Sequence, residues 1–465
     1  MKVLEHSTAT SGYVSTDSRT TNDKSYSNHV NPQWVRLLEL LQMDVRYTRC
    51  QGVELYTVNG DRILDFLSGY CVHNVGHNHP AIISALHDEL ERCGPAMLQS
   101  HVADLAGELA EKLCKLAGGR LNKAYFCSSG SEGVETAIKF ARAYTGRAGM
   151  LYCNGAFHGL TLGALSLMAD SSWAKGFGPY FPDFDRVPFN DLAELEQKLA
   201  TRKYAAFIVE PIQSENGIRI PSADYLREAQ ALCRRYGSLF VLDEVQTGMY
   251  RTGRFLAAQH YALDPDMVVL AKALSGGLVP SGAVLMSDEI YDSVYSSLGR
   301  AIIHTSTYSE NGLAMRAGLA VLQVCEEEDL GGRATTMGAQ LRQKLSEALS
   351  GYDLVGEVRG LGMLNGIEFH SPKKLSLKVP FEAFRAIHPA MFGQVLVMRL
   401  FREHQILTQV CGNNFMVLKV APPLIVTSEQ TDYFVNAAKE VMEVVHSSAS
   451  FWGDALRLAR RALNI

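Results

Sequence analysis

Leu239-Phe240-Val241-Leu242-Asp243-Glu244-Val245-Gln246-Thr247-Gly248 is the stretch that decides the fold, because four apolar residues end abruptly at two carboxylates. A run this short and this apolar is typical of a buried strand. Comparable runs, separated by helical or turn-rich segments, lie at 124–127, 150–153, 207–209, 267–270 and 283–286. Short buried strands that alternate with helices predict an α/β domain, whose mostly parallel sheet has helices on both faces.

Helical and hairpin patterns surround these runs. Apolar spacing predicts helices at residues 34–43, 82–92, 103–116 and 134–144, and a largely helical stretch at 313–349. Residues 53–65 contain a turn at Asn59-Gly60, which predicts a β-hairpin. Strand patterns at 354–368 and 415–420 and a helical pattern at 431–445 predict a smaller α+β unit. The N-terminal hairpin is expected to join that unit.

The predicted elements divide the chain into four segments. Residues 1–28 are rich in Ser, Thr and Asn, and we expect a disordered leader there because they cannot bury enough apolar surface to offset the entropy of ordering. Residues 29–80 are expected to be an N-terminal segment that joins the small domain. A large domain is expected at 81–325, and a C-terminal small domain at 326–465.

The composition excludes several classes of protein. Of the 465 residues 47% are hydrophobic and 20% charged, and the formal net charge is -5 without a long basic run, which argues against bulk binding of nucleic acid. No apolar stretch approaches the roughly 20 residues that span a bilayer. Nine cysteines without a Cys-x-x-Cys pair fit a reduced protein better than a disulfide framework. A cytoplasmic enzyme is therefore the leading expectation.

The first chemical signal is Cys127-Ser128-Ser129-Gly130-Ser131-Glu132, which follows a predicted strand and opens a predicted helix. Small residues there let backbone N–H groups approach an anion, and the helix dipole favours negative charge. The alternative is a plain helix cap by Ser129 or Ser131.

Two further signals lie at the ends of predicted strands. Asp243 directly follows four apolar residues, and a buried carboxylate needs a partner such as a protonated ring nitrogen, a metal or an arginine. Lys272 also follows an apolar run, and desolvation there would lower its pKa and make it nucleophilic. Taken alone, each residue is more often a turn aspartate or a solvated lysine. Together with an anion cradle they are the parts that a pyridoxal phosphate site needs.

At these residues the chain resembles the class III (ornithine, putrescine and ω-amino-acid type) aminotransferases of the fold-type I pyridoxal-phosphate enzymes, over about residues 52–445. The motifs that agree in order and spacing are Asp65-Phe66-Leu67-Ser68-Gly69, Asn74-Val75-Gly76-His77, Ser129-Gly130-Ser131-Glu132, Gly155-Ala156-Phe157-His158-Gly159, Glu210-Pro211-Ile212-Gln213, 242–248, Lys272 and Ala421-Pro422-Pro423-Leu424. The resemblance implies a large domain of mostly parallel sheet flanked by helices, a smaller α+β domain, pyridoxal 5′-phosphate as cofactor, and a homodimer that shares its active sites.

The resemblance also implies roles for individual residues. The cofactor-binding residues would be Ser129, Gly130, Ser131, Phe157, His158, Asp243, Gln246, Lys272 and Thr307. Lys272 would form the Schiff base and shuttle the proton, and Asp243 would pair with the pyridine nitrogen. Gln246 would reach the phenolic oxygen, and Phe157 would stack on the ring with His158 beside it. Thr307 would reach the phosphate of the neighbouring subunit.

Three residues are expected to contact the substrate: Tyr70, Glu215 and Lys419. In the ornithine-type pattern an arginine before Ala-Pro-Pro grips a carboxylate, and a glutamate pairs with it when no carboxylate is bound. Here Glu215 is present, but Lys419 stands where that arginine is expected. Because a lysine is a point charge without a two-donor fork, carboxylate recognition is weakened or moved. Arg399 or Arg402 could take over.

Other features leave alternatives open. Asn31-Pro32 resembles the putrescine-type branch, whereas the apolar insert at 387–414 resembles a branch associated with hopanoid lipid tailoring, although a dimer-contact or core helix explains the insert more simply. The amphipathic stretch 451–463 would either dock on its own small domain or lie on an anionic membrane surface. His73, His77 and His79 have metal-like spacing, but no carboxylate cluster accompanies them and we predict no metal site.

The resulting functional hypothesis is an aminotransferase that moves a terminal primary amine between a putrescine-like or ornithine-like donor and a 2-oxo acid or aldehyde, by a ping-pong mechanism. One alternative is an aminotransferase of hopanoid or other lipid tailoring. Another is an aminomutase, racemase or decarboxylase on the same scaffold, and a third is a non-catalytic partner protein that keeps only the fold.

Overall fold

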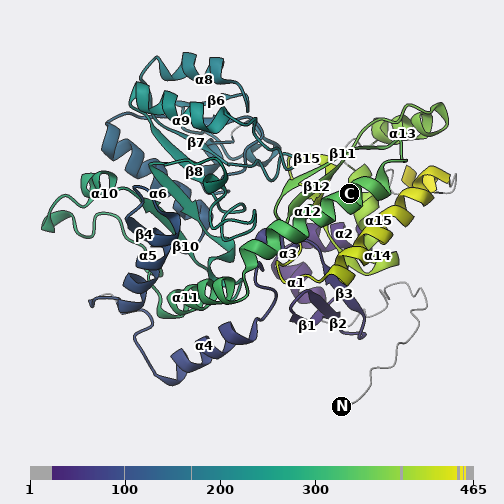
Figure 1. Ribbon diagram of the computed structural model, residues 1–465, viewed down its shortest axis with the longest axis horizontal. Coiled ribbons are helices and arrows are strands. Elements are labelled where there is room, and N and C mark those ends of the chain that lie inside the picture. The colour runs from purple at the N-terminus through teal and green to yellow at the C-terminus, as the bar shows by residue number, and fades with distance from the viewer. Residues whose placement is uncertain are drawn as a thin grey trace.

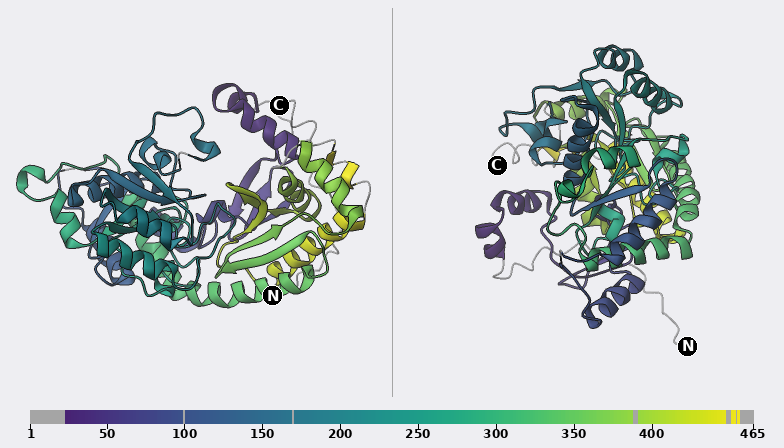
Figure 2. Two further views of the ribbon diagram at one scale, coloured as in Figure 1. Left: turned by 90° about the horizontal axis from the view of Figure 1, so that it is seen from above. Right: turned by 90° about the vertical axis from the view of Figure 1, so that its left-hand side faces the viewer.

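The computed structural model describes residues 23–98, 100–168, 170–387, 391–447, 451–453 and 455–456. They form two lobes, and the long helices α11 (Gly312–Glu327) and α12 (Leu330–Leu349) carry the chain from the larger lobe to the smaller one (Figure 1). Figure 2 shows these two helices running along one side of both lobes, and α1 (Asp23–His29) and α2 (Pro32–Leu41) at the edge of the smaller lobe.

The larger lobe contains a seven-stranded sheet in the order β4-β10-β9-β8-β7-β5-β6. Its strands are β4 (Lys123–Cys127), β5 (Gly149–Cys153), β6 (Phe184–Val187), β7 (Tyr204–Val209), β8 (Leu239–Asp243), β9 (Met267–Leu270) and β10 (Gly282–Met286). The pairs from β9 to β6 are parallel, and β10 is antiparallel to both of its neighbours. The predicted mostly parallel α/β sheet is confirmed.

Successive residues of β8 belong to different hydrophobic cores, because side chains of a strand point alternately to its two faces. Leu239 and Val241 pack in one core with Val134 of α6 (Gly130–Thr145). Phe240 and Leu242 pack in the other core, with residues of α5 (Asp104–Ala117) and α9 (Tyr225–Tyr236). The apolar run that predicts this strand is continuous because helices cover both faces of the sheet.

The other helices of the chain up to residue 300 are short or of medium length. They are α3 (Ser68–Cys71), α4 (Pro80–Glu91), α5 (Asp104–Ala117), α7 (Leu162–Ser166), α8 (Leu192–Leu199), α9 (Tyr225–Tyr236) and α10 (Asp288–Val294), with 3-10 turns η1 (Ser172–Ala174), η2 (Ala257–His260), η3 (Lys272–Ser275) and η4 (Leu298–Arg300).

The smaller lobe holds two four-stranded sheets, β11-β12-β15-β14 and β1-β2-β3-β13. The first consists of β11 (Val355–Leu361), β12 (Leu364–Phe369), β14 (Gln409–Cys411) and β15 (Asn414–Val420), and the second of β1 (Tyr47–Gln51), β2 (Glu54–Thr57), β3 (Arg62–Asp65) and β13 (Ile406–Leu407). The predicted N-terminal hairpin is β2–β3, and β3 pairs with β13 from the C-terminal part of the chain. Helices α13 (Leu375–Ile387), α14 (Phe392–His404) and α15 (Ser428–Ser447) complete the lobe.

The structure describes only part of the two terminal segments, 1–28 and 451–463, for which the sequence makes predictions. Helix α1 begins at Asp23, inside the stretch expected to be a disordered leader, because it packs on the following helix α2; residues 1–22 lie outside the described residues. At the other end, Trp452 stacks on Phe392 of α14 with ring centroids 6.1 Å apart, which favours docking of this segment on its own lobe. Residues 457–463 of the expected amphipathic helix lie outside the described part.

The insert at 387–414 contributes a core helix. Helix α14 buries an apolar face that includes Val395, Leu396 and Phe401, and it packs against β15 and α15. No helix in the described part of the chain combines the length and the apolar character needed to cross a membrane.

Candidate active site

The candidate site is a cavity of about 380 Å³ at the carboxyl ends of the central strands. Asp243 is the last residue of β8, Lys272 follows β9 after one residue, and Glu210 follows β7 directly. Ser129 and its neighbours follow β4, which runs in the same direction as β9. Carboxyl ends of parallel strands meet at one edge of a sheet, and ligands of open α/β sheets bind there.

Asp243 is buried and held by two donors. Its Oδ2 lies 2.8 Å from His158 Nδ1, and its Oδ1 accepts a hydrogen bond from Val245 N–H at 3.0 Å. His158 is also buried, and its Nε2 finds no hydrogen-bond partner among the described residues. The carboxylate is therefore fixed in orientation, and it retains lone pairs for a cationic donor within the cavity.

Lys272 lines the cavity from a strained backbone position. Its φ is +48°, in the left-handed region, which costs a residue with a side chain on the order of 1 kcal/mol. Burial lowers the pKa of Lys272, and the nearby carboxylates of Glu215 and Asp243 oppose that effect without cancelling it. A lysine with a lowered pKa has a larger fraction of neutral, nucleophilic amine at neutral pH.

The segment before α6 caps the helix and also lines the cavity. Ser129 Oγ caps the helix by accepting a hydrogen bond from Glu132 N–H at 3.2 Å. Gly130 lines the cavity, and a Cβ added there would lie 3.0 Å from Val245. Ser131 Oγ accepts from Leu160 N–H at 3.3 Å. Because these side chains are small, they leave room for an anion beside the N-terminus of a long helix.

Phe157 and Glu210 form a neighbouring part of the cavity wall. Phe157 N–H donates to Glu210 Oε1 at 3.0 Å, and Ser214 N–H donates to Glu210 Oε2 at 3.1 Å. Burial raises the pKa of Glu210 to about 7, although His158 and the two N–H donors act against it. Glu210 belongs to the motif Glu210-Pro211-Ile212-Gln213, for which the sequence predicts no role. Its position directly after an apolar strand, the same signal that singles out Asp243, could have identified it.

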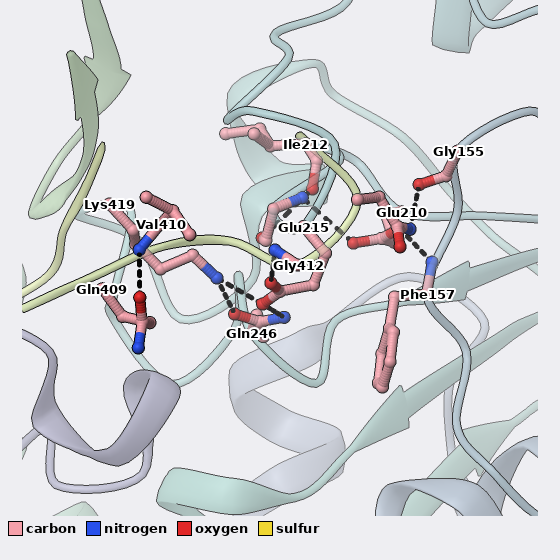
Figure 3. Close-up of polar contacts among 12 residues, drawn as sticks. Gly155, Phe157, Glu210, Ile212, Glu215, Gln246, Gln409, Val410, Gly412 and Lys419 are labelled. Atoms are coloured by element: carbon pink, nitrogen blue, oxygen red, sulfur yellow. Dashed lines mark hydrogen bonds and ion pairs between the residues drawn. The ribbon is translucent and has the colours of Figure 1, made fainter. Parts of the chain in front are cut away.

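Glu215, Lys419 and Gln246 form a second, connected cluster (Figure 3). Lys419 Nζ makes an ion pair with Glu215 Oε1, and Gln246 Nε2 donates to the same oxygen at 3.0 Å. Lys419 Nζ also donates to Gln246 Oε1 at 3.2 Å. Lys419 comes from β15 of the smaller lobe, whereas the other two belong to the larger lobe. We call these three residues the clamp.

The clamp is charged although it is buried. Lys419 is 0% exposed and Glu215 is 6% exposed. Burial alone would lower the pKa of Lys419, but the Glu215 carboxylate outweighs it and raises that pKa. Burial alone would raise the pKa of Glu215, but Lys419 and the surrounding donors lower it. Each charge is thus maintained by the other, and Gln246, which lines the cavity, links the pair to the site.

The structure brings eight of the predicted cofactor residues to one cavity and leaves Thr307 outside it. The eight are Ser129, Gly130, Ser131, Phe157, His158, Asp243, Gln246 and Lys272. Thr307 is exposed in the segment before α11. Tyr70 lies beside the clamp, with Lys419 Nζ 5.3 Å from its ring centroid. Arg399 is paired with Glu403 on α14 and does not line the cavity.

Two of the three histidines with metal-like spacing contact carboxylates elsewhere in the chain, and the third stacks on one of them. His77 Nε2 lies 2.7 Å from Asp65 Oδ2, and His79 Nε2 lies 3.1 Å from Glu328 Oε1. His73 stacks on the ring of His77 with centroids 3.8 Å apart. Their spacing is therefore explained by structural contacts of the turn between α3 and α4.

The chain matches known proteins over most of its length. The family model for aminotransferase class-III matches residues 39–442. The aminotransferase PigE of Serratia sp. (strain ATCC 39006) is 33% identical over 449 residues, which cover 90% of this chain and 53% of PigE, so the chain spans about half the length of that relative.

Solved structures agree as well. An ornithine aminotransferase from Toxoplasma gondii ME49 has a TM-score of 0.77 at 30% identity, covering 92% of this chain and 99% of that one. An acetylornithine aminotransferase from Elizabethkingia anophelis has a TM-score of 0.71 at 31% identity, covering 89% and 98%. An amine transaminase from an uncultivated Pseudomonas species, solved with PLP bound, has a TM-score of 0.76 at 28% identity, covering 86% and 94%. The seven-stranded sheet with its smaller sheets matches these fold-type I structures, and the relatives give no support for the hopanoid-associated branch.

Proposed function

The chain belongs to the class-III aminotransferases, and we propose that it moves a terminal primary amino group from a putrescine-like or ornithine-like donor to a 2-oxo acid or aldehyde by a ping-pong mechanism. The observation that carries this proposal is the convergence of Lys272, Asp243 and the start of α6 on one cavity. Pyridoxal 5′-phosphate is the cofactor typical of this family. When bound, it supplies an electron-withdrawing ring that acidifies the C–H bond next to the amine.

The residues present fit that cofactor. The cavity offers a helix N-terminus without bulky side chains at Gly130 for a phosphate, and the buried carboxylate of Asp243 for a ring N–H. It also offers the amine of Lys272, whose pKa burial lowers, for a covalent link to an aldehyde. Phe157 provides an aromatic face, with His158 beside it, and Gln246 provides the amide of the clamp that lines the cavity.

The chain's own residues supply positioning and proton transfer. His158 and Val245 N–H hold Asp243 in one orientation, so that it need not reorganise when it meets a cationic donor. Lys272 can accept a proton as a neutral amine and return it as an ammonium group. Because the amine leaves its donor before the acceptor enters, the two substrates use the same cavity in turn.

The clamp supports a donor that brings no carboxylate to Lys419. In the closed clamp, the charge of Lys419 is already neutralised by Glu215. A donor carboxylate would have to displace Glu215 before it could bind Lys419, whereas a plain amine would not. An aldehyde acceptor also leaves the clamp closed, and a 2-oxo acid acceptor requires it to open.

A half-reaction screen tests the proposal. Purified holoenzyme mixed with an amine alone should lose the cofactor's visible absorbance and stop there until a carbonyl acceptor is added. Diamines and simple amines should react faster than ornithine. An aminomutase, racemase or decarboxylase would instead turn over a single substrate with no acceptor, and that result would contradict the proposal.

We also propose that the chain works as a homodimer. Large apolar side chains are exposed in the segments 97–102 and 298–303: Met97 is 39% exposed, Val102 85%, Leu298 97% and Ile302 81%. Large apolar side chains that are this exposed favour burial against another protein surface. Thr307 lies close to the second segment, which fits a contribution to the neighbouring site. Sedimentation velocity of the holoenzyme should give the mass of two chains, and a monomer at micromolar concentration would contradict this proposal.

A further inference from the structure

The turn between β14 and β15 reaches from the smaller lobe to Glu215 of the larger lobe (Figure 3). Gly412 N–H donates to Glu215 Oε2 at 2.7 Å, and Asn413 N–H donates to the Glu215 carbonyl oxygen at 2.9 Å. Lys419 and Gln246 bind the other carboxylate oxygen. The orientation of Glu215 in the clamp therefore depends on where this turn lies.

The Asn413 side chain fixes the turn to the larger lobe. Its Oδ1 accepts a hydrogen bond from Trp173 Nε1–H at 2.8 Å. Its Nδ2 donates to the carbonyl oxygens of Gly155 at 2.9 Å and Ala156 at 3.2 Å. Both ends of the side-chain amide are thus bonded to the segment that leads into Phe157 or to the tryptophan that packs on it.

The turn also fits closely between its neighbours. A Cβ added at Gly412 would lie 3.1 Å from Glu215 Oε2 and 3.3 Å from Trp173 Cζ2. Trp173 packs edge-on against Phe157, with ring centroids 5.6 Å apart. Since Phe157 lines the cavity, the turn connects the cavity wall to the clamp.

We propose that Asn413 is a positioning residue that keeps the clamp closed in the amine half-reaction, and that it thereby sets a preference for donors without a carboxylate. Asn413 holds the turn in place, the turn presents Gly412 N–H to Glu215, and Glu215 neutralises Lys419. This inference rests on the proposed aminotransferase function and assigns part of its donor selectivity to a residue that does not line the cavity of about 380 Å³.

Opening the clamp costs free energy because Glu215 must leave its donors. Glu215 can leave Lys419 only by giving up the Gly412 N–H bond as well, and a buried carboxylate that loses donors is strongly destabilised. A mobile turn could follow Glu215 and preserve that bond. A turn that is fixed by Trp173 and two backbone carbonyl groups cannot follow Glu215. A donor carboxylate therefore competes for Lys419 against all the hydrogen bonds that hold Glu215 in the clamp.

The test compares two donors of equal length, pentylamine and 5-aminopentanoate, in the amine half-reaction of the holoenzyme. Wild type should prefer pentylamine. Asn413→Ala should raise the relative rate constant for 5-aminopentanoate about tenfold, through a lower half-saturating concentration, while the maximal rate with pentylamine stays within about twofold. Pentanoate, which has no amine and cannot react, should inhibit the variant at lower concentration than it inhibits wild type.

Trp173→Phe provides an independent variant, because it keeps an aromatic edge on Phe157 but removes the hydrogen bond to Asn413. It should shift the donor preference in the same direction by a smaller factor, and it carries the test if Asn413→Ala does not fold. Trp34→Phe, on the exposed face of α2, is the matched control and should leave the preference unchanged.

The outcomes are distinguishable. If wild type reacts with pentylamine but both variants keep its donor preference and its sensitivity to pentanoate, the role of Asn413 is wrong and the proposed function stands. If wild type reacts with neither amine, this inference fails. The proposed function fails with it only if putrescine and ornithine do not react either.

Discussion

Arg251 and Lys419 are two fully buried cations that join the lobes, and they are stabilised in different ways. Arg251 makes no ion pair among the described residues; its guanidinium donates to the side chains of Asn74 and Ser68 and to the carbonyl oxygens of Met363 and Pro422. Burial lowers the pKa of Arg251, whereas Glu215 raises that of Lys419 against the effect of burial.

Arg251 therefore forms a fixed structural contact between the lobes, whereas the partner of Lys419 can be exchanged. The partners of Arg251 are oxygens of three chain segments, and the planar guanidinium can bind them together because it has five donors in fixed directions. Lys419 depends on one carboxylate at the end of a rotatable side chain. A substrate carboxylate can replace that partner, but nothing in a substrate can replace the partners of Arg251.

The largest effect on stability is expected for Arg251→Met. Removing the guanidinium leaves several buried oxygens without donors, and at 1–3 kcal/mol each the unfolding free energy should fall by roughly 4 kcal/mol or more. Urea unfolding of the holoenzyme measures it, with Arg254→Met as the exposed control. A loss below about 1 kcal/mol would show that these contacts do not hold the lobes together.

Glu215→Gln should come next, because it leaves the ammonium group of Lys419 buried without a counter-charge. Breaking one partner of a buried ion pair costs about 3–5 kcal/mol. The double variant Glu215→Gln with Lys419→Met removes both charges and should recover most of that loss. If the double variant is less stable than Glu215→Gln alone, the charges of Glu215 and Lys419 do not depend on each other as described above.

Lys419→Met should reverse the sign with which acid changes the stability contributed by Glu215. In wild type the lowered pKa of Glu215 gives stability above the ordinary carboxyl pKa of about 4.3, and this is lost as pH falls through the folded value. The raised pKa of Lys419 gives stability below about pH 10, which is lost only as pH rises through its higher folded value. Without Lys419, burial raises the pKa of Glu215, so the variant should gain stability relative to wild type between about pH 7 and pH 5. Urea midpoints measured across this range test the sign.

Lys419→Arg should have the smallest effect on stability and an effect on selectivity in a defined direction. An arginine keeps the charge and offers a two-donor fork, so 5-aminopentanoate and 2-oxo acids should react a few-fold faster relative to pentylamine and aldehydes. The unfolding free energy should change by about 1 kcal/mol. Unchanged selectivity would mean that no substrate carboxylate reaches position 419.

The sequence predicts those elements whose residue pattern fits only one kind of structure. The runs at β4, β5, β7, β8, β9 and β10 are apolar because both faces of the sheet are covered, and all six strands are present. β6, with the sequence Phe184-Asp185-Arg186-Val187, was missed because it lies at the sheet edge and alternates too briefly to be distinctive. Helix α13 was missed because Pro380 lies inside it.

Site residues that directly follow a predicted strand could be predicted from the sequence. Contacts between turns that are far apart in the sequence could not. Asp243 and Lys272 were found from their positions after apolar runs, and the resemblance added Glu215 and Lys419. The contact of Trp173 with Asn413 joins residues 240 positions apart, and neither residue type is unusual in its local sequence. Only the packing of the two lobes brings that tryptophan, that asparagine and the clamp together.

The most direct test of this account is to locate the cofactor's covalent bond between the two buried lysines. Holoenzyme is reduced with borohydride and digested, and the pyridoxyl-labelled peptide is sequenced by mass spectrometry. The label should lie on Lys272, whose pKa is lowered, and be absent from Lys419, whose charge is held by Glu215. A label on Lys419, on any other lysine, or on none would contradict the assignment.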